Sequence, residues 1–124
     1  MLSVEVVATD EFLKWWNDPK EVDDQCKNAI YEAIELLERE GVSLRFPYQS
    51  NIEGSKYAFR ELRKSAGPHV LRIIYAFDRD RDAVLIIGGD KAGDNRFYEW
   101  IIPRAETIWE QYLREREAEK KKHE

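Results

Sequence analysis

Residues 56–98 have the sequence KYAFRELRKSAGPHVLRIIYAFDRDRDAVLIIGGDKAGDNRFY, and they contain most of the predicted sheet. Aliphatic, β-branched and aromatic residues over 57–63, 70–77 and 83–87 predict three strands. The segments 65–68 and 78–82, which are rich in turn-forming and charged residues, predict short turns between them. Since short turns join antiparallel neighbours, we expect a small, mainly antiparallel sheet.

Alternation along the strand over 70–77 assigns its two faces. One side carries four bulky apolar residues, which we expect to face the helices: Leu71, Ile73, Tyr75 and Phe77. Arg72 then lies on the opposite face, which we expect to be open. The same parity, with Leu62 pointing inward, places Glu61 and Arg63 on that open face, with Arg63 in line with Arg72 across the strand pair.

The N-terminal part is expected to form a strand and a helix hairpin. Residues 4–8 predict a strand, and aromatic residues at helical spacing predict a short helix over 10–17. An apolar stripe predicts a second helix over 19–40, with Asp18 as its cap. The single cysteine, Cys26, falls on this stripe, so we expect a buried thiol and no internal disulfide.

Residues 42–55 are expected to form a loop, because Pro47 and Gly54 interrupt any periodic pattern. Three apolar side chains are expected to pin this loop to the domain: Leu44, Phe46 and Tyr48.

The C-terminal part is expected to be helical with an interruption. Pro103 predicts a turn or short helix over 95–101 and a separate helix that begins near 103. The charged tail over 115–124 has no apolar stripe, so we expect frayed helix or disorder there. The remaining residues, 1–114, are expected to form a single domain.

The charge is unevenly distributed along the chain. The formal net charge is −5, which argues against a general nucleic-acid binder. Residues 1–54 contain 12 acids and 5 bases, whereas residues 55–98 contain 6 acids and 9 bases. A local basic patch on an acidic body can bind an anion, and a mixed-charge surface is the alternative. The sequence has no apolar run of membrane-spanning length and no signal-peptide pattern, so we expect a cytoplasmic protein.

Four motifs carry a resemblance to a known family. They are FRELR at 59–63, RIIYAFD at 72–78, LIIGGDKAG at 85–93 and RFY at 96–98. Their order and spacing resemble the RelE/ParE superfamily of toxins from type II toxin–antitoxin systems, specifically the HigB-like, phage-derived branch. The resemblance implies an α+β fold with the element order β-α-α-β-β-β-α, a helix hairpin on one sheet face and a C-terminal helix.

The resemblance also implies an activity. RelE and HigB toxins are small cytoplasmic endoribonucleases, or mRNA interferases, that cut mRNA on the ribosome without a metal or another cofactor. The 2′-hydroxyl attacks the adjacent phosphate and leaves a 2′,3′-cyclic phosphate. The implied partners are the ribosome, mRNA and a cognate antitoxin, expected to be of helix-turn-helix type, and no membrane.

The resemblance indicates site residues at matching positions. The catalytic candidates are Arg72, Lys91, Arg96 and Tyr98. The candidates for RNA or phosphate binding are Lys56, Arg60 and Arg63. Glu61 and His69 are candidates for a general base or an ion-pair partner. Cations would stabilise the growing charge of a phosphorane, and Tyr98 could stack on a base or assist proton transfer. Each side chain also has a structural interpretation, such as a Glu61–Arg63 ion pair.

Two other functions stay open. One is a ParE-like gyrase poison without RNA chemistry. The other is a non-catalytic relative that only engages an antitoxin or a phage partner, and the sequence pI of about 5.2 favours it.

Overall fold

The computed structural model describes residues 3–122 and confirms the α+β class. The elements, in chain order, are β1 (Val6–Ala8), α1 (Asp10–Trp16), α2 (Asp24–Glu40), a 3-10 turn (Gly41–Ser43), β2 (Gln49–Asn51), β3 (Arg60–Ala66), β4 (His69–Phe77), β5 (Ala83–Asp90) and α3 (Phe97–Lys122). Among the described residues, no helix is both long and apolar enough to cross a membrane.

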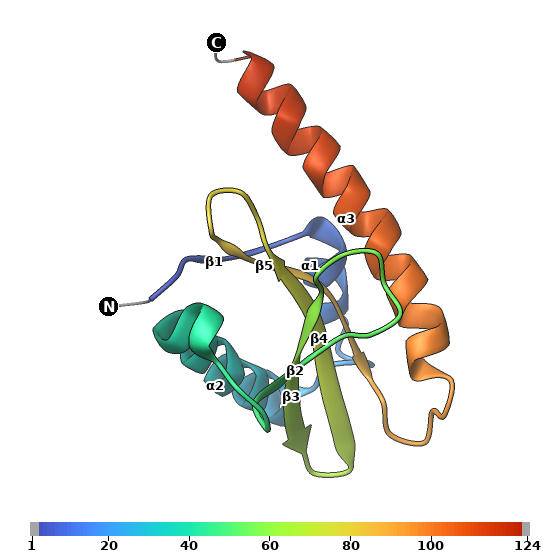
Figure 1. Cartoon of the computed structure of the whole chain (residues 1–124). Helices are drawn as coiled ribbons and strands as arrows, with labels where there is room; N and C mark the ends of the chain where they lie inside the picture. Colours follow the sequence, from blue (N-terminus) through green and yellow to red (C-terminus); the bar gives the residue numbers. More distant parts are fainter. Residues whose placement is uncertain (1–2, 123–124) are drawn as a thin grey trace.

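The five strands form one open sheet in the order β1-β5-β4-β3-β2 (Figure 1). β2, β3, β4 and β5 pair antiparallel with their neighbours, and β1 pairs parallel with β5. The mainly antiparallel sheet is therefore confirmed. Tight hairpins connect β3 to β4 and β4 to β5, so the three longest strands are consecutive in sequence as well as in space.

Helices α1 and α2 cover one face of the sheet. The buried residues of α2 include Cys26, Ile30 and Leu37, and they form one core with the inward residues of β4, Leu71, Ile73 and Tyr75. The expected face assignment of β4 and the expected burial of Cys26 are confirmed. A β-bulge near Ile74 and Tyr75 shifts the pairing of β4 with β5 without exchanging the faces.

The opposite face is not open, which corrects the expectation. α3 packs across it and builds a second core with the outward residues of β4 and β5 (Figure 1). Ile74 and Ile86 from the sheet meet Phe97, Ile101 and Trp109 from α3 in this core. The sheet is thus buried on both faces over much of its area, and polar side chains on the α3 face lie beside an apolar layer.

Two adjacent glycines bring both helical layers close to β5. A Cβ atom on Gly88 would lie 2.3 Å from the Trp15 ring of α1, and one on Gly89 would lie 2.8 Å from the Phe97 ring of α3. Any side chain at either position would displace an aromatic ring. Because successive residues of a strand point to opposite faces, the pair accommodates one ring on each side.

The start of α2 differs from the prediction. The helix begins at Asp24 and its N-cap is Asp23, whose Oδ1 accepts a hydrogen bond from the Cys26 amide at 2.8 Å. Asp18 instead accepts from the Lys20 amide at 3.0 Å and closes a turn. Aspartate is a favourable N-cap residue at either position, so the residue type does not show which one begins the helix. Val22 lies in the core although it precedes the helix, so the apolar stripe does not mark the helix start either.

The segment 42–55 is not entirely loop. Gln49–Asn51 forms the edge strand β2 on β3, although its polar residues have low strand propensity, because the exposed edge of β3 supplies the pairing. Phe46 and Tyr48 are exposed, at 68% and 56%, so of the three expected anchors only Leu44 is buried.

Strand β3 begins at Arg60 and continues to Ala66, three residues beyond the predicted end. Ser65 and Ala66 pair with Val70 and His69, so the turn is shorter than expected. Gly67 makes that turn with a φ of 57°, a conformation that glycine adopts without a steric penalty.

The C-terminal segment is one continuous helix, which corrects the predicted break at Pro103. Pro103 is exposed, so the carbonyl that loses its hydrogen bond can be hydrated, while Ile101 and Ala105 on either side are buried against the sheet. The helix continues to Lys122 and extends beyond the body of the protein (Figure 1). Of the tail over 115–124, residues 123–124 lie outside the described residues.

Candidate functional site

A buried carboxylate, Glu61, is the centre of a polar cluster on the α3 face. Its Oε2 accepts hydrogen bonds from Ser50 Oγ at 2.6 Å and from Arg63 Nη1 at 3.3 Å. Its Oε1 accepts one from the Tyr98 hydroxyl at 2.7 Å and lies 3.7 Å from Arg72 Nε. Glu61 is only 3% exposed, so protein groups take the place of water around it. We call these five residues the Glu61 cluster.

The strand register explains why the cluster forms. Arg63 on β3 pairs directly with Arg72 on β4, and like charges at directly opposed positions repel. Glu61 lies two residues before Arg63 on the same face and contacts both guanidinium groups. The carboxylate therefore neutralises part of a repulsion that the register itself creates.

Arg72 is nearly as buried as Glu61, at 7% exposed. Its Nη1 donates to the backbone carbonyl of Leu71 at 3.0 Å, while its Nε finds no hydrogen-bond acceptor among the described residues. A buried guanidinium requires a nearby negative charge, and Glu61 supplies it. Arg72 is thus held under the surface, whereas the Arg63 side chain, at 29% exposed, reaches solvent.

Tyr98 brings the first turn of α3 into the cluster. Burial, followed by the hydrogen bond to Glu61, raises the pKa of the Tyr98 hydroxyl above its ordinary value. The phenol therefore keeps its proton at neutral pH and remains a donor. The ammonium of Lys91 lies 5.8 Å from the Tyr98 ring centroid, within the range of a cation–π contact. The Lys91 amide donates to the Val70 carbonyl at 2.8 Å, which holds this residue beside the start of β4.

Three of the predicted arginine and lysine residues lie away from the cluster. The side chain of Arg96 is 81% exposed and lies 4.0 Å from Glu99, one turn further along. Arg60 belongs to the other sheet face, where its Nη1 donates to the Val42 carbonyl at 3.1 Å. Lys56 pairs with Glu110 of α3 at 3.1 Å. The structure therefore brings Glu61, Arg63, Arg72, Lys91 and Tyr98 together and leaves Lys56, Arg60 and Arg96 apart.

His69 is held at the start of β4 by a different carboxylate. Its Nδ1 lies 2.6 Å from Asp90 Oδ2, and its Nε2 lies 3.9 Å from Asp23. The hydrogen bond with Asp90 raises the pKa of the imidazole. His69 is thus hydrogen-bonded to Asp90 in this structure and is not a member of the Glu61 cluster.

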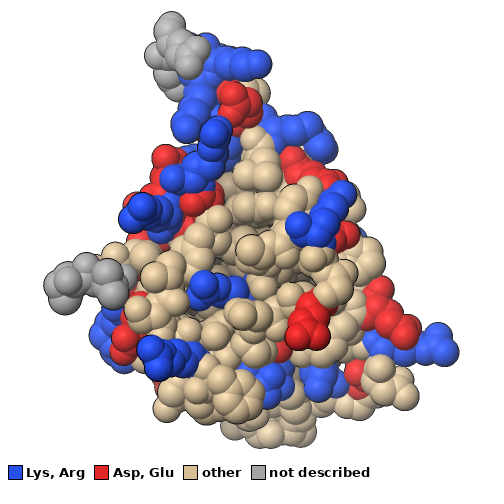
Figure 2. Space-filling model, in the orientation of Figure 1, with Lys and Arg blue, Asp and Glu red and all other residues tan. Residues whose placement is uncertain are grey.

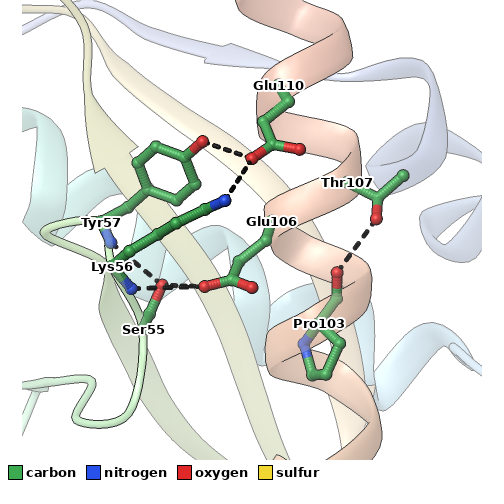
Figure 3. Close-up of polar contacts among 7 residues, drawn as sticks. All are labelled: Ser55, Lys56, Tyr57, Pro103, Glu106, Thr107 and Glu110. Atoms are coloured by element: carbon green, nitrogen blue, oxygen red, sulfur yellow. Dashed lines mark hydrogen bonds and ion pairs between the residues drawn. The ribbon is translucent and has the colours of Figure 1, made fainter.

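A second tyrosine–glutamate group joins the segment before β3 to the middle of α3 (Figure 3). The Tyr57 hydroxyl and the Lys56 ammonium both bind Glu110 Oε2. One turn earlier, Glu106 Oε2 accepts from Ser55 Oγ at 2.7 Å. The bond from Tyr57, followed by the one from Lys56, lowers the pKa of Glu110. We call Lys56, Tyr57 and Glu110 the Glu110 group.

The sequence does not indicate Ser50 as a site residue, and it indicates Phe46 and Tyr48 only as packing residues of the preceding loop. Ser50 lies on β2, a strand without a sequence signal, and donates to Glu61. The exposed Phe46 ring lies 5.1 Å from the Arg63 guanidinium. Tyr48 and Arg63 also line a groove of about 350 Å³ between α2 and β3. Phe46 and Tyr48 lie beside Arg63 because β2 pairs with β3, and the sequence does not predict that pairing.

On the face shown in Figure 2, charge is spread rather than concentrated. Basic and acidic side chains lie mainly around the edge of this view and on the projecting end of α3, and the centre is largely uncharged apart from one basic and one acidic group. This view gives no continuous basic surface of the kind that binds a long polyanion. The cationic groups of the Glu61 cluster form a local site.

Comparisons with known proteins agree on one family. Residues 17–110 match the family described as "Phage derived protein Gp49-like (DUF891)". The chain is 40% identical over 86 residues to "Putative toxin HigB3" of Mycobacterium tuberculosis, covering 68% of this chain and 75% of that protein. It is 34% identical over 104 residues to "Putative toxin HigB2" of the same organism, covering 82% of this chain.

The chain spans about half the length of HigB2, at 52%. No solved structure gives a significant match. The family model and the two relatives confirm the resemblance to the HigB-like, phage-derived branch. The chain belongs to the phage-derived, Gp49-like protein family.

Proposed function

We propose that this protein is the toxin of a toxin–antitoxin system and that it cleaves RNA at the Glu61 cluster. The toxin assignment is supported by the printed names of the two HigB relatives. The RNA chemistry is supported by one observation: a buried carboxylate gathers two arginines and a protonated tyrosine next to a lysine. The proposed partners are a cognate antitoxin that inhibits the chain and ribosome-bound mRNA as substrate.

Arg63 of the Glu61 cluster and the adjacent Lys91 would contact the RNA. Arg63 and Lys91 are partly exposed and supply positive charge to the non-bridging phosphate oxygens, where negative charge grows in the transition state. Arg72 is buried, so its role in this proposal is to add positive potential from below and to hold Glu61 in place. Phe46 and Tyr48, exposed beside Arg63, would stack on RNA bases.

Cleavage needs a group that accepts the proton of the 2′-hydroxyl. Glu61 is the proposed base, and it becomes available when a phosphate draws Arg63 away, because that 3.3 Å hydrogen bond is the longest that Glu61 accepts. The 2′-oxygen then bonds to phosphorus, the bond from phosphorus to the 5′-oxygen breaks, and Tyr98 donates a proton to the leaving 5′-oxygen. The products are a 2′,3′-cyclic phosphate and a 5′-hydroxyl end.

An expression experiment tests this proposal. Wild-type protein should arrest bacterial growth and produce mRNA fragments with 2′,3′-cyclic phosphate ends. Lys91→Ala should lower cleavage by about 100-fold, the size of effect that one preorganised donor contributes. Arg79→Ala, at the exposed hairpin tip between β4 and β5, is the matched control and should retain full cleavage. Growth arrest with intact mRNA would contradict the RNA chemistry and leave the toxin assignment standing.

A binding-only relative is the second candidate. Its support is that Glu61 already accepts three hydrogen bonds and that the chain has a net charge of −5. Harmless expression of folded protein, with no change in mRNA, would favour it.

A further inference from the structure

Three elements meet at a corner of the fold that the proposed RNA chemistry does not use. The start of α2 contributes Asp23 and Cys26, the start of β4 contributes His69, and the end of β5 contributes Asp90. One ligand atom from each of Asp23, Cys26 and His69 lies within 4.8 Å of the other two. We propose that these three residues bind a Zn²⁺ ion. This proposal is independent of the proposed function.

The orientation of His69 is the first argument. Asp90 Oδ2 lies 2.6 Å from His69 Nδ1, and Asp90 Oδ1 accepts hydrogen bonds from the amides of Val70 and Ala92 at 3.0 and 2.9 Å. Asp90 is therefore fixed by the backbone, and it in turn fixes the imidazole ring. A carboxylate on one ring nitrogen is the usual arrangement behind a metal-binding histidine.

The environment of the other ring nitrogen is the second argument. With a proton on Nδ1, Nε2 presents a lone pair, and the nearest charged atom is Asp23 Oδ2 at 3.9 Å. Both atoms carry lone pairs, and a cation between them would be bound by both. A proton on Nε2 is one such cation, and a metal ion bound by both atoms is the other.

The position of Cys26 favours a metal ion over a proton between His69 and Asp23. Its thiol is fully buried and lies within the same ligand-atom cluster, although a simple His–Asp ion pair would need no sulfur. Asp23 Oδ1 caps α2 through the Cys26 amide, so Oδ2 can bind an ion without disturbing the helix start. Thiolate, imidazole and carboxylate together are a typical zinc ligand set, and three protein ligands leave one coordination position for water.

An ion at this corner would tie separate parts of the chain together. The β3–β4 turn already packs against α2, since a Cβ atom on Gly67 would lie 3.0 Å from Gln25 Oε1. Zinc would connect this hairpin to the first turn of α2 by coordinate bonds. We expect Zn²⁺ to raise the melting temperature of the full chain, because an ion bound only by the folded state stabilises it.

Metal titration of the full chain tests the proposal. After treatment with a chelator, the protein should bind one equivalent of Zn²⁺, and with Co²⁺ it should show the near-ultraviolet absorption of a cobalt–thiolate bond. Cys26→Ser should remove that band, and His69→Ala should weaken Zn²⁺ binding at least about tenfold. Asp24→Asn changes the adjacent exposed carboxylate and is the matched control, with no expected change.

Asp90→Asn tests the supporting carboxylate and should weaken binding by about 10–100-fold without loss of the cobalt–thiolate band. Absence of one-equivalent binding in the wild type would overturn the proposal. Binding that Cys26→Ser and His69→Ala leave unchanged would also overturn it. If Cys26→Ser does not fold, the wild-type spectrum still decides, because bound Co²⁺ without a thiolate band contradicts a site at Cys26.

Discussion

The Glu61 cluster and the Glu110 group use the same chemistry in two environments. Glu61 on β3 accepts a hydrogen bond from the Tyr98 hydroxyl and pairs with Arg72. Glu110 on α3 accepts one from the Tyr57 hydroxyl and pairs with Lys56. The Glu61 side chain is 4% exposed and that of Glu110 is 35% exposed. Water can replace the partners of Glu110 but has little access to the Glu61 carboxylate itself. The two groups therefore differ in how much the fold depends on them.

Removal of the central carboxylate gives the largest expected effect. Glu61→Ala leaves the buried Arg72 guanidinium without a counter-charge, and we expect a loss of about 3–5 kcal/mol in the free energy of unfolding. Urea denaturation followed by circular dichroism measures this. Glu110→Ala is the matched variant and should have a much smaller effect, because its partners remain hydrated. An equal loss in the free energy of unfolding for both variants would contradict the expectation that the buried carboxylate contributes more to stability than the exposed one.

Removal of one hydroxyl from each site gives the next largest effect. Tyr98→Phe loses a hydrogen bond to a buried carboxylate, for which we expect about 1.5–3 kcal/mol of destabilisation. Tyr57→Phe loses the equivalent bond at the surface and should be distinctly less destabilising. The comparison is informative because both changes remove a single oxygen atom. A more stable Tyr98→Phe variant would mean that the Glu61 bond does not stabilise the fold.

The pH dependence of the Glu110 group gives the smallest expected effect. Its bonds to Tyr57 and Lys56 lower the pKa of Glu110 in the folded state. The stabilisation is therefore present above the ordinary glutamate pKa and is lost as the pH falls through the lowered, folded-state pKa. We expect wild type to be more stable than Glu110→Gln at neutral pH, and the difference to vanish in acid. Thermal melts across the acidic range test this, and a difference that grows in acid would contradict the sign.

The contributions of the two sites to stability should also respond differently to added salt. The Lys56–Glu110 pair is exposed, so its contribution should fall as added salt screens it, while the buried Arg72–Glu61 pair is screened much less. The stability difference between wild type and Lys56→Ala should shrink with salt, and that between wild type and Glu61→Ala should persist. Denaturation in low and high sodium chloride measures both differences.

Much of the sheet could be predicted from alternation in the sequence. The strand over 70–77 has one fully apolar side, so the face of Arg72 follows from the pleat alone, and its alignment with Arg63 follows from a short antiparallel turn. The boundaries of α2 and β3 were less well predicted. Asp18 and Asp23 have equal capping chemistry, and residues 64–66 carry no strand signal of their own.

Local periodicity and short connections are enough to predict the three central strands, the apolar stripe of α2 and the alignment of Arg63 with Arg72 from the amino-acid sequence. The continuation of α3 through Pro103 across the second sheet face depends on tertiary packing, since buried residues on both sides of the proline outweigh one lost hydrogen bond. Tertiary packing also determines which neutral hydrogen-bond donors reach Glu61. Ser50 and Tyr98 are separated from Glu61 by 11 and 37 residues, and their contact depends on how β2 and α3 pack on the sheet.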